Sequence, residues 1–157
     1  PVGIEIERKF LVDRAQLGRL VGGESLYQGY IATNGLAAVR VRVAANRAWL
    51  TLKGEPRGAA RSEFEYEIPA QDALDILEEL CGTVVAKTRY RREYLGHTWE
   101  IDVFDGSNAG LVIAEVELDN EADTPALPDW VAEEVTGDPR YYNVNLATHP
   151  FSEWPEQ

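Results

Sequence analysis

Charged and apolar residues alternate along nearly every extended segment of this chain, and this alternation limits the possible folds more than any other feature. In the segment 4–12, Glu5, Glu7 and Lys9 occupy alternate positions, and mostly apolar residues lie between them. Because successive side chains of a strand point to opposite faces, the pattern predicts a strand with one charged and one apolar face. Seven further segments are expected to be strands of this kind: 26–33, 37–44, 48–53, 61–69, 84–95, 98–104 and 111–118.

Four other segments carry signals of helices. Apolar residues recur at helical spacing over 73–81. Asp13 is placed to cap a short helix over 14–21. Further short helices are expected around 130–135 and over 140–147. A helix with an apolar stripe needs an apolar surface, so we expect these helices to cover the apolar faces of the strands.

The charged faces carry both signs of charge, and two arrangements satisfy this pattern. In the first, helices cover one side of an open sheet and the charged side faces water, as is common for antiparallel sheets. In the second, the sheet closes into a tunnel, with the helices outside and the charges lining the interior. Because burying unpaired charge is costly, a closed tunnel would need a ligand such as a polyanion bound together with a divalent cation. The alternation alone leaves both arrangements open.

Composition narrows the class of protein and its partners. The chain has 157 residues, of which 45% are hydrophobic and 27% charged, so we expect residues 1–157 to form a single globular domain. The net charge of −12 argues against nucleic acid and anionic membranes as partners, and the apolar runs are too short to cross a membrane. The lone cysteine, Cys81, has no internal disulfide partner, so the cytoplasm is the expected compartment. Nothing in the sequence indicates an oligomeric state.

The charged segments also resemble a known protein family. Glu5, Glu7 and Lys9 form the E-x-E-x-K motif of the CYTH superfamily, whose members are also called triphosphate tunnel metalloenzymes. Segments that resemble the family follow in the family order: 27–30, 39–42, 51–53, 63–67, 87–90, 99–104, 115–117 and 134–143. The resemblance covers essentially the whole chain, and an ordered set of this kind is far more specific than one short motif.

This resemblance implies the closed arrangement: an α+β, mainly β fold in which eight antiparallel strands form a tunnel with a charged lumen and external helices. Members of the family bind triphosphate groups and a divalent metal, usually Mg²⁺ or Mn²⁺. The chain looks most like the short bacterial inorganic tripolyphosphatases, which implies metal-dependent hydrolysis of tripolyphosphate, a small anionic substrate, to pyrophosphate and phosphate. The alternatives are a thiamine triphosphatase, a class IV adenylate cyclase, and a non-catalytic sensor that binds polyphosphate or nucleotide.

The resemblance also implies roles for individual residues. The residues expected to bind the metal are Glu5, Glu7, Glu115 and Glu117, since hard cations prefer oxygen ligands. The residues expected to bind the triphosphate are Lys9, Arg40, Arg42, Lys53, Lys87 and Arg89. The candidates for catalytic work are Lys9, Glu63, Glu65, Lys87 and Asp102. For the middle-strand acids, charge balance with the basic residues is an equal alternative: Glu63, Glu65, Glu100 and Asp102.

Overall fold

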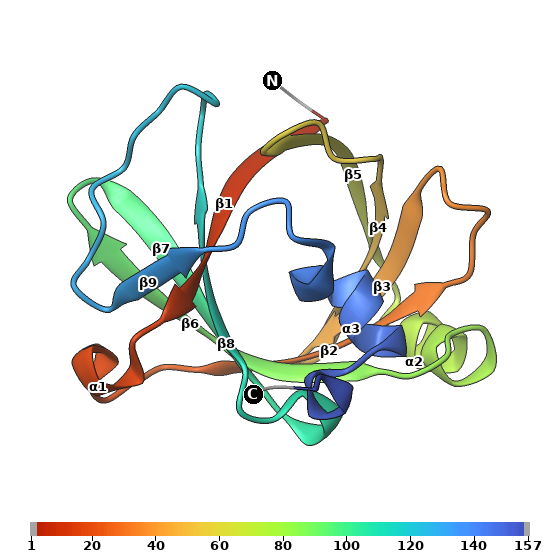
Figure 1. Ribbon diagram of the computed structural model, residues 1–157. Coiled ribbons are helices and arrows are strands. Elements are labelled where there is room, and N and C mark those ends of the chain that lie inside the picture. The colour runs from red at the N-terminus through yellow and green to blue at the C-terminus, as the bar shows by residue number, and fades with distance from the viewer. Residues whose placement is uncertain (1–2, 156–157) are drawn as a thin grey trace.

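The computed structural model describes residues 3–155 and shows a closed antiparallel β-barrel (Figure 1). Within these residues, eight strands follow one another around the barrel in the order β1-β5-β4-β3-β2-β6-β7-β8 and return to β1. Their bounds are β1 Ile4–Val12, β2 Glu24–Ile31, β3 Ala38–Ala44, β4 Arg47–Lys53, β5 Ala60–Ile68, β6 Val85–Tyr94, β7 His97–Phe104 and β8 Val112–Glu117. The predicted strands are all present, and the sheet is closed rather than open.

The barrel closes along β1, one edge of which is shared between two partner strands. The first part of that edge pairs residues 4–6 with residues 60–62 of β5. Further along, the same edge pairs with an additional strand, β9 (Val131–Glu134). The opposite edge pairs with β8 over residues 7–11. As a result, the first strand contacts both the middle and the end of the chain.

The expectation of a helix around 130–135 is wrong, because this segment forms β9. The open edge of β1 decides the outcome: the Val135 backbone N–H donates to the Lys9 carbonyl at 2.8 Å, at the end of the β1–β9 pairing. A one-turn helix would leave most of its backbone groups without partners, whereas pairing with an exposed strand edge satisfies them. Tertiary contact therefore overrides the local helical pattern.

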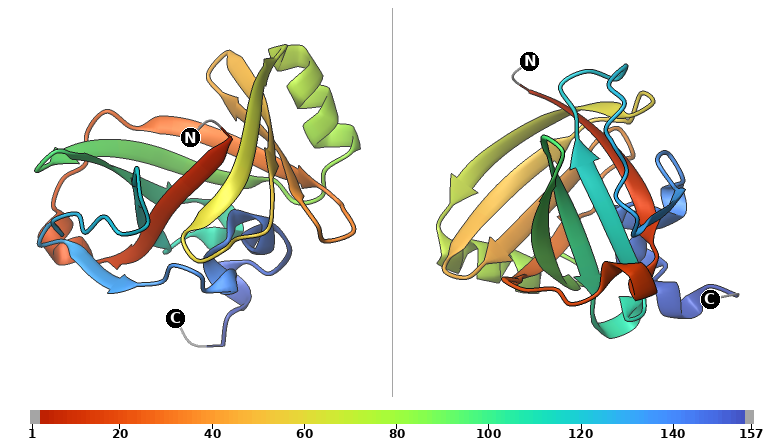
Figure 2. Two further views of the ribbon diagram at one scale, coloured as in Figure 1. Left: turned by 90° about the horizontal axis from the view of Figure 1, so that it is seen from above. Right: turned by 90° about the vertical axis from the view of Figure 1, so that its left-hand side faces the viewer.

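In the described part of the chain, three α-helices accompany the barrel: α1 (Arg14–Leu17), α2 (Ala70–Glu79) and α3 (Asn143–Thr148). Asp13 caps α1 as predicted, by accepting hydrogen bonds from two backbone N–H groups. Figure 2 shows α2 along the outside of the barrel, where it packs against β3 and β4. The segment that leads into α3 instead lines one end of the lumen, so this helix is not wholly external. No helix within residues 3–155 is both long enough and apolar enough to cross a membrane.

Much of the apolar core lies on the outer face of the barrel. Phe10, Trp99 and Ile101 are fully buried there, and Trp130 packs edge-on against Trp99 with ring centroids 5.6 Å apart. A second cluster joins the start of β6 and the end of β7 to the C-terminal segment, which includes the fully buried Leu146. The strands therefore present their apolar sides outward and leave the lumen to charged side chains.

Candidate functional site

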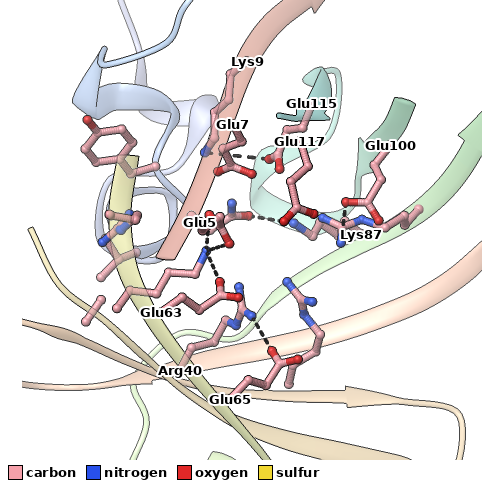
Figure 3. A pocket seen from close by; sticks show the side chains of 18 of the residues that line it. Glu5, Glu7, Lys9, Arg40, Glu63, Glu65, Lys87, Glu100, Glu115 and Glu117 are labelled. Carbon is pink, nitrogen blue, oxygen red and sulfur yellow. Dashed lines mark hydrogen bonds and ion pairs between the residues drawn. The ribbon is translucent and has the colours of Figure 1, made fainter. Parts of the chain in front are cut away.

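The alternation of the strands places the predicted charged residues around a cavity of about 270 Å³ inside the barrel (Figure 3). The predicted site residues that line it are Glu5, Glu7, Lys9, Arg40, Arg42, Lys53, Glu63, Glu65, Lys87, Arg89, Glu115 and Glu117. Asp102 is the exception among the predicted residues, because it lies behind the cavity wall and is only 1% exposed. Arg91 and Glu100, whose side chains point to the same faces of their strands as the predicted residues do, line the cavity as well.

The acidic side of the lumen is formed by β1 and β8, where Glu7 lies directly opposite Glu117 in the strand pairing. Burial raises the pKa of Glu7 well above its ordinary value, and the charges of Glu115 and Glu5 raise it further. Burial would also raise the pKa of Glu115, but the attraction of Lys9 and Arg89 outweighs it and lowers that pKa to about 2. Carboxylates are thus crowded on this side, with too little nearby positive charge for Glu7.

The carboxylate oxygens of these glutamates are suitable ligands for a hard divalent cation. Among the described residues, no three acidic, histidine or cysteine side chains already stand in a metal-holding arrangement. Instead, burial raises the pKa of both Glu5 and Glu7, and neighbouring carboxylates, Glu63 and Glu115 among them, raise these pKa values further. A divalent cation would compensate this excess of negative charge, and oxygen ligands are what Mg²⁺ and Mn²⁺ prefer.

The basic side formed by β3 is short of anionic partners. Arg40 is 6% exposed, and its Nη2 donates to Thr51 at 3.2 Å and to Glu65 at 3.4 Å. Its buried Nε has no hydrogen-bond partner in the described structure. Arg42 donates to the Gln28 side chain at 3.2 Å, and within residues 3–155 it makes no ion pair with a carboxylate. Phosphate oxygens would supply the acceptors that this wall lacks.

Burial explains why the Arg42 guanidinium needs an anion. Burial lowers the pKa of Arg42 to about 10, and repulsion by Arg40 and Arg89 contributes to the shift. A buried positive charge without a partner costs free energy, and a bound anion removes that cost. The arrangement on β3 is therefore that of an anion-binding wall.

The basic side formed by β6 is paired, because Asp102 of β7 accepts from two cations. Arg89 binds Asp102 in a bidentate fork at 2.7 and 2.9 Å, and the Lys87 Nζ lies 2.7 Å from the same carboxylate. Burial alone would raise the pKa of Asp102, but attraction by Lys87 and Arg89 outweighs it and holds that pKa well below its usual range. The position of Asp102 fits charge balance better than direct contact with a substrate.

Two further lysines bridge the walls of the lumen. The Lys53 Nζ lies 3.2 Å from a Glu5 oxygen and 3.3 Å from a Glu63 oxygen, so it joins β4 to β1 and β5. The Lys9 Nζ lies 3.8 Å from Glu115 and 5.5 Å from the centre of the Tyr142 ring. Both ammonium groups face the cavity, where a phosphate group would meet them.

The alternating charge pattern does not reveal the part of the site that comes from the C-terminal segment. Tyr142, Asn143 and Val144 line the cavity, and Lys87 donates to Asn143 Oδ1 at 3.0 Å. These residues carry no charge and do not belong to an alternating strand, so the pattern that found the other residues could not find them. Arg61 was missed as well, although it has the same parity as Glu63 and also lines the cavity.

The family model of the CYTH domain matches residues 3–148. The chain belongs to the CYTH domain family. This CYTH protein is 47% identical over 156 residues to an inorganic triphosphatase of Acetivibrio thermocellus, and the match covers 99% of this chain and 100% of the relative. It is also 38% identical over 147 residues to an inorganic triphosphatase of Nitrosomonas europaea, across 91% of this chain and 96% of that protein.

Solved structures agree with this assignment. The crystal structure of an inorganic triphosphatase superposes on this CYTH protein with a TM-score of 0.64 and 36% sequence identity. The superposition covers 90% of this chain and 96% of the solved chain. The tunnel predicted from the resemblance is thus supported by the sequence relatives and by the fold.

Proposed function

We propose that this CYTH protein hydrolyses a phosphoanhydride bond of inorganic tripolyphosphate, giving pyrophosphate and phosphate. The observation that carries the proposal is the anion-binding wall on β3, where Arg42 has no carboxylate partner in the described structure and the buried Arg40 Nε has no acceptor. A chain of phosphates matches a narrow charged cavity of about 270 Å³. The names of the two bacterial relatives support the same substrate.

Substrate binding is proposed for the cations of the lumen: Lys9, Arg40, Arg42, Lys53, Lys87 and Arg89. Arginine forks suit the paired oxygens of phosphate groups, and the lysines add point charges from neighbouring strands. The guanidinium of Arg89 already forms a bidentate interaction with Asp102. Arg40 and Arg42 are therefore proposed to bind the phosphates most directly.

The proposed metal ligands are Glu5, Glu7, Glu115 and Glu117, and the proposed metal is Mg²⁺ or Mn²⁺. When bound, the cation would screen phosphate charge and lower the pKa of a bound water. The chain's own residues orient the substrate so that charge developing on the phosphate oxygens meets cations that are already in place. Burial lowers the pKa of Lys87 to about 7, with Arg89 and Arg42 adding to the shift, which suits Lys87 to passing a proton to the departing phosphate.

Glu63 and Glu65 are proposed to hold the basic wall and the attacking water in position. Glu65 accepts from Thr51 at 2.8 Å and from Arg40, which leaves it firmly oriented. Burial would raise the pKa of Glu63, but its hydrogen bond with Glu5 and the attraction of Lys53 outweigh it and lower that pKa. A low pKa favours charge balance at Glu63 over proton abstraction.

The free Cys81 supports a further proposal, that the enzyme acts in the cytoplasm.

The function is tested by measuring phosphate release from tripolyphosphate, ATP, thiamine triphosphate and long-chain polyphosphate, with Mg²⁺, Mn²⁺ or chelator. We expect turnover of tripolyphosphate that a chelator abolishes. Glu7→Gln and Lys9→Ala are expected to reduce that turnover by roughly 100-fold or more while circular dichroism remains unchanged. Near-normal turnover in either variant would show that the site assignment is wrong, and tight binding without any phosphate release would favour a sensor.

A further inference from the structure

Lys87 is held by an acceptor that comes from outside the barrel strands. Its side chain is fully buried, and its ammonium lies over the Phe104 ring at 5.3 Å and pairs with Asp102 at 2.7 Å. The Nζ also donates to the side-chain oxygen of Asn143 at 3.0 Å. An ammonium group has three donors, so these two acceptors fix its orientation and leave one donor for the cavity that Lys87 lines.

Asn143 is well anchored for this task. It is the first residue of α3, directly after Tyr142, and its own side chain faces the lumen. On one side Tyr141 is buried and packs edge-on against Trp154, with ring centroids 5.2 Å apart. On the other side Leu146 is fully buried against the ends of the barrel strands. The anchor on both sides holds the amide at a defined place beside Lys87.

The uncharged amide is suited to this position. Asp102 supplies the carboxylate that pairs with Lys87, whereas Arg89 pairs both with Asp102 and, at 3.3 Å, with Glu100. A further carboxylate at position 143 would add negative charge directly beside the Lys87 ammonium and repel a phosphate. An amide oxygen instead accepts a hydrogen bond and orients the ammonium without neutralising it.

We propose that Asn143 is a positioning residue, which holds the Lys87 ammonium so that its remaining donor points at a phosphate oxygen of the substrate. The inference rests on the proposed function, because it assigns Lys87 to triphosphate binding. Asn143 acts through Lys87, so the effect of losing its amide depends on Lys87 being present.

The experiment measures tripolyphosphate affinity by calorimetry in the presence of chelator, together with kcat/KM in the presence of Mg²⁺. Asn143→Leu keeps the size of the side chain and removes the acceptor, and Asn143→Ala is a second variant in case the first does not fold. We expect a loss of affinity of about 10-fold, in keeping with a hydrogen bond to a charged group. Asn145→Ala is the matched control, because Asn145 lies in the same helix and its amide donates to the Pro139 carbonyl at 2.8 Å. The control is expected to bind like the wild type.

A double-mutant cycle with Lys87→Met separates positioning from packing. The affinity loss caused by Asn143→Leu is expected to vanish when Lys87 is already replaced. An equal loss in both backgrounds, or wild-type affinity in the single variants at residue 143, would overturn the proposal. An equal loss in Asn145→Ala would also overturn it, because that result assigns the effect to loosening of the segment.

A spectroscopic measurement keeps this inference separate from the proposed function. The Lys87 ammonium signal in proton–nitrogen spectra, assigned by its disappearance in Lys87→Met, is expected to be visible in the wild type and broadened by fast exchange in Asn143→Leu. If tripolyphosphate is not hydrolysed but this difference is seen, the proposed substrate is wrong and the positioning contact stands. If hydrolysis is normal and the signal is the same in both proteins, the positioning role is wrong.

Discussion

The two basic walls of the lumen both carry buried cations but differ in how these charges are compensated. On β6, Lys87 and Arg89 share the carboxylate of Asp102, which is 1% exposed. On β3, Arg42 makes no ion pair within the described residues, and Arg40 leaves a buried donor without an acceptor. This difference shows that a cation does not bind substrate directly merely because it lies in the tunnel. The β6 wall stabilises the fold and aims Lys87, whereas the β3 wall needs an anion.

The largest effect is expected from Asp102→Ala, which would leave Lys87 and Arg89 buried without their shared partner. Removing one member of a buried ion network typically costs about 3–5 kcal/mol of folding free energy. Urea unfolding of the variant and the wild type measures this loss. Glu67→Ala is the control, because its pair with Arg47 lies at the surface and is expected to contribute little.

The pH dependence of the same variant checks its physical cause. The folded pKa of Asp102 is lower than its unfolded value, so its contribution to stability is present above about pH 4 and is lost as the pH falls further. The stability deficit of Asp102→Ala is therefore expected to shrink below about pH 4. A deficit that stays constant during acidification would contradict the assignment of Asp102 as the charged partner.

A smaller and opposite effect is expected from Arg42→Gln on the β3 wall. Affinity for tripolyphosphate should fall by about 10- to 100-fold, because a charge-assisted hydrogen bond to the ligand is lost. Thermal stability of the free protein should be unchanged or higher, since repulsion with Arg40 and Arg89 is relieved. Calorimetry and thermal unfolding measure the two quantities. A destabilised variant that binds normally would remove the proposed distinction between the walls.

The smallest effect is expected from Arg91→Gln, although Arg91 shares the parity of Lys87 and Arg89. Its side chain is 54% exposed, and it pairs with Glu100 at 3.2 Å. Pairs at this exposure contribute about 0–1 kcal/mol, so stability should change little. Affinity for tripolyphosphate should fall less than in Arg42→Gln. An equal fall in the two variants would show that burial does not decide which arginines bind phosphate.

Parity along the strands explains which parts of the site the sequence predicts. The backbone of a strand fixes the face of each side chain, so Glu5, Glu7 and Lys9 had to point together wherever β1 was placed. Closure of the barrel, in contrast, was predicted from the family resemblance, because an open sheet would show the same alternation. The strand pairing of Arg89 with Asp102 depends on register between two strands, which no single segment contains.

Two elements escaped prediction because their structure is determined by distant residues. β9 reads locally as a helix and becomes a strand only when the edge of β1 is available to it. Asn143 carries no charge, and its role appears only when α3 packs at the end of the lumen beside Lys87. The sequence alone does not show which uncharged polar residues lie next to the lysines of the lumen, because these neighbours are distant along the chain.

The shared edge of β1 has a consequence for biosynthesis. β1 is translated before all of its partners, which lie at residues 60–62, 113–117 and 131–134. Pairings this distant along the polypeptide form slowly, and the barrel cannot close until β8 has been synthesised. Until then, the backbone amides of the nascent strand are unpaired and exposed to neighbouring chains. The charged residues of the strand disfavour hydrophobic association and so protect it from aggregation.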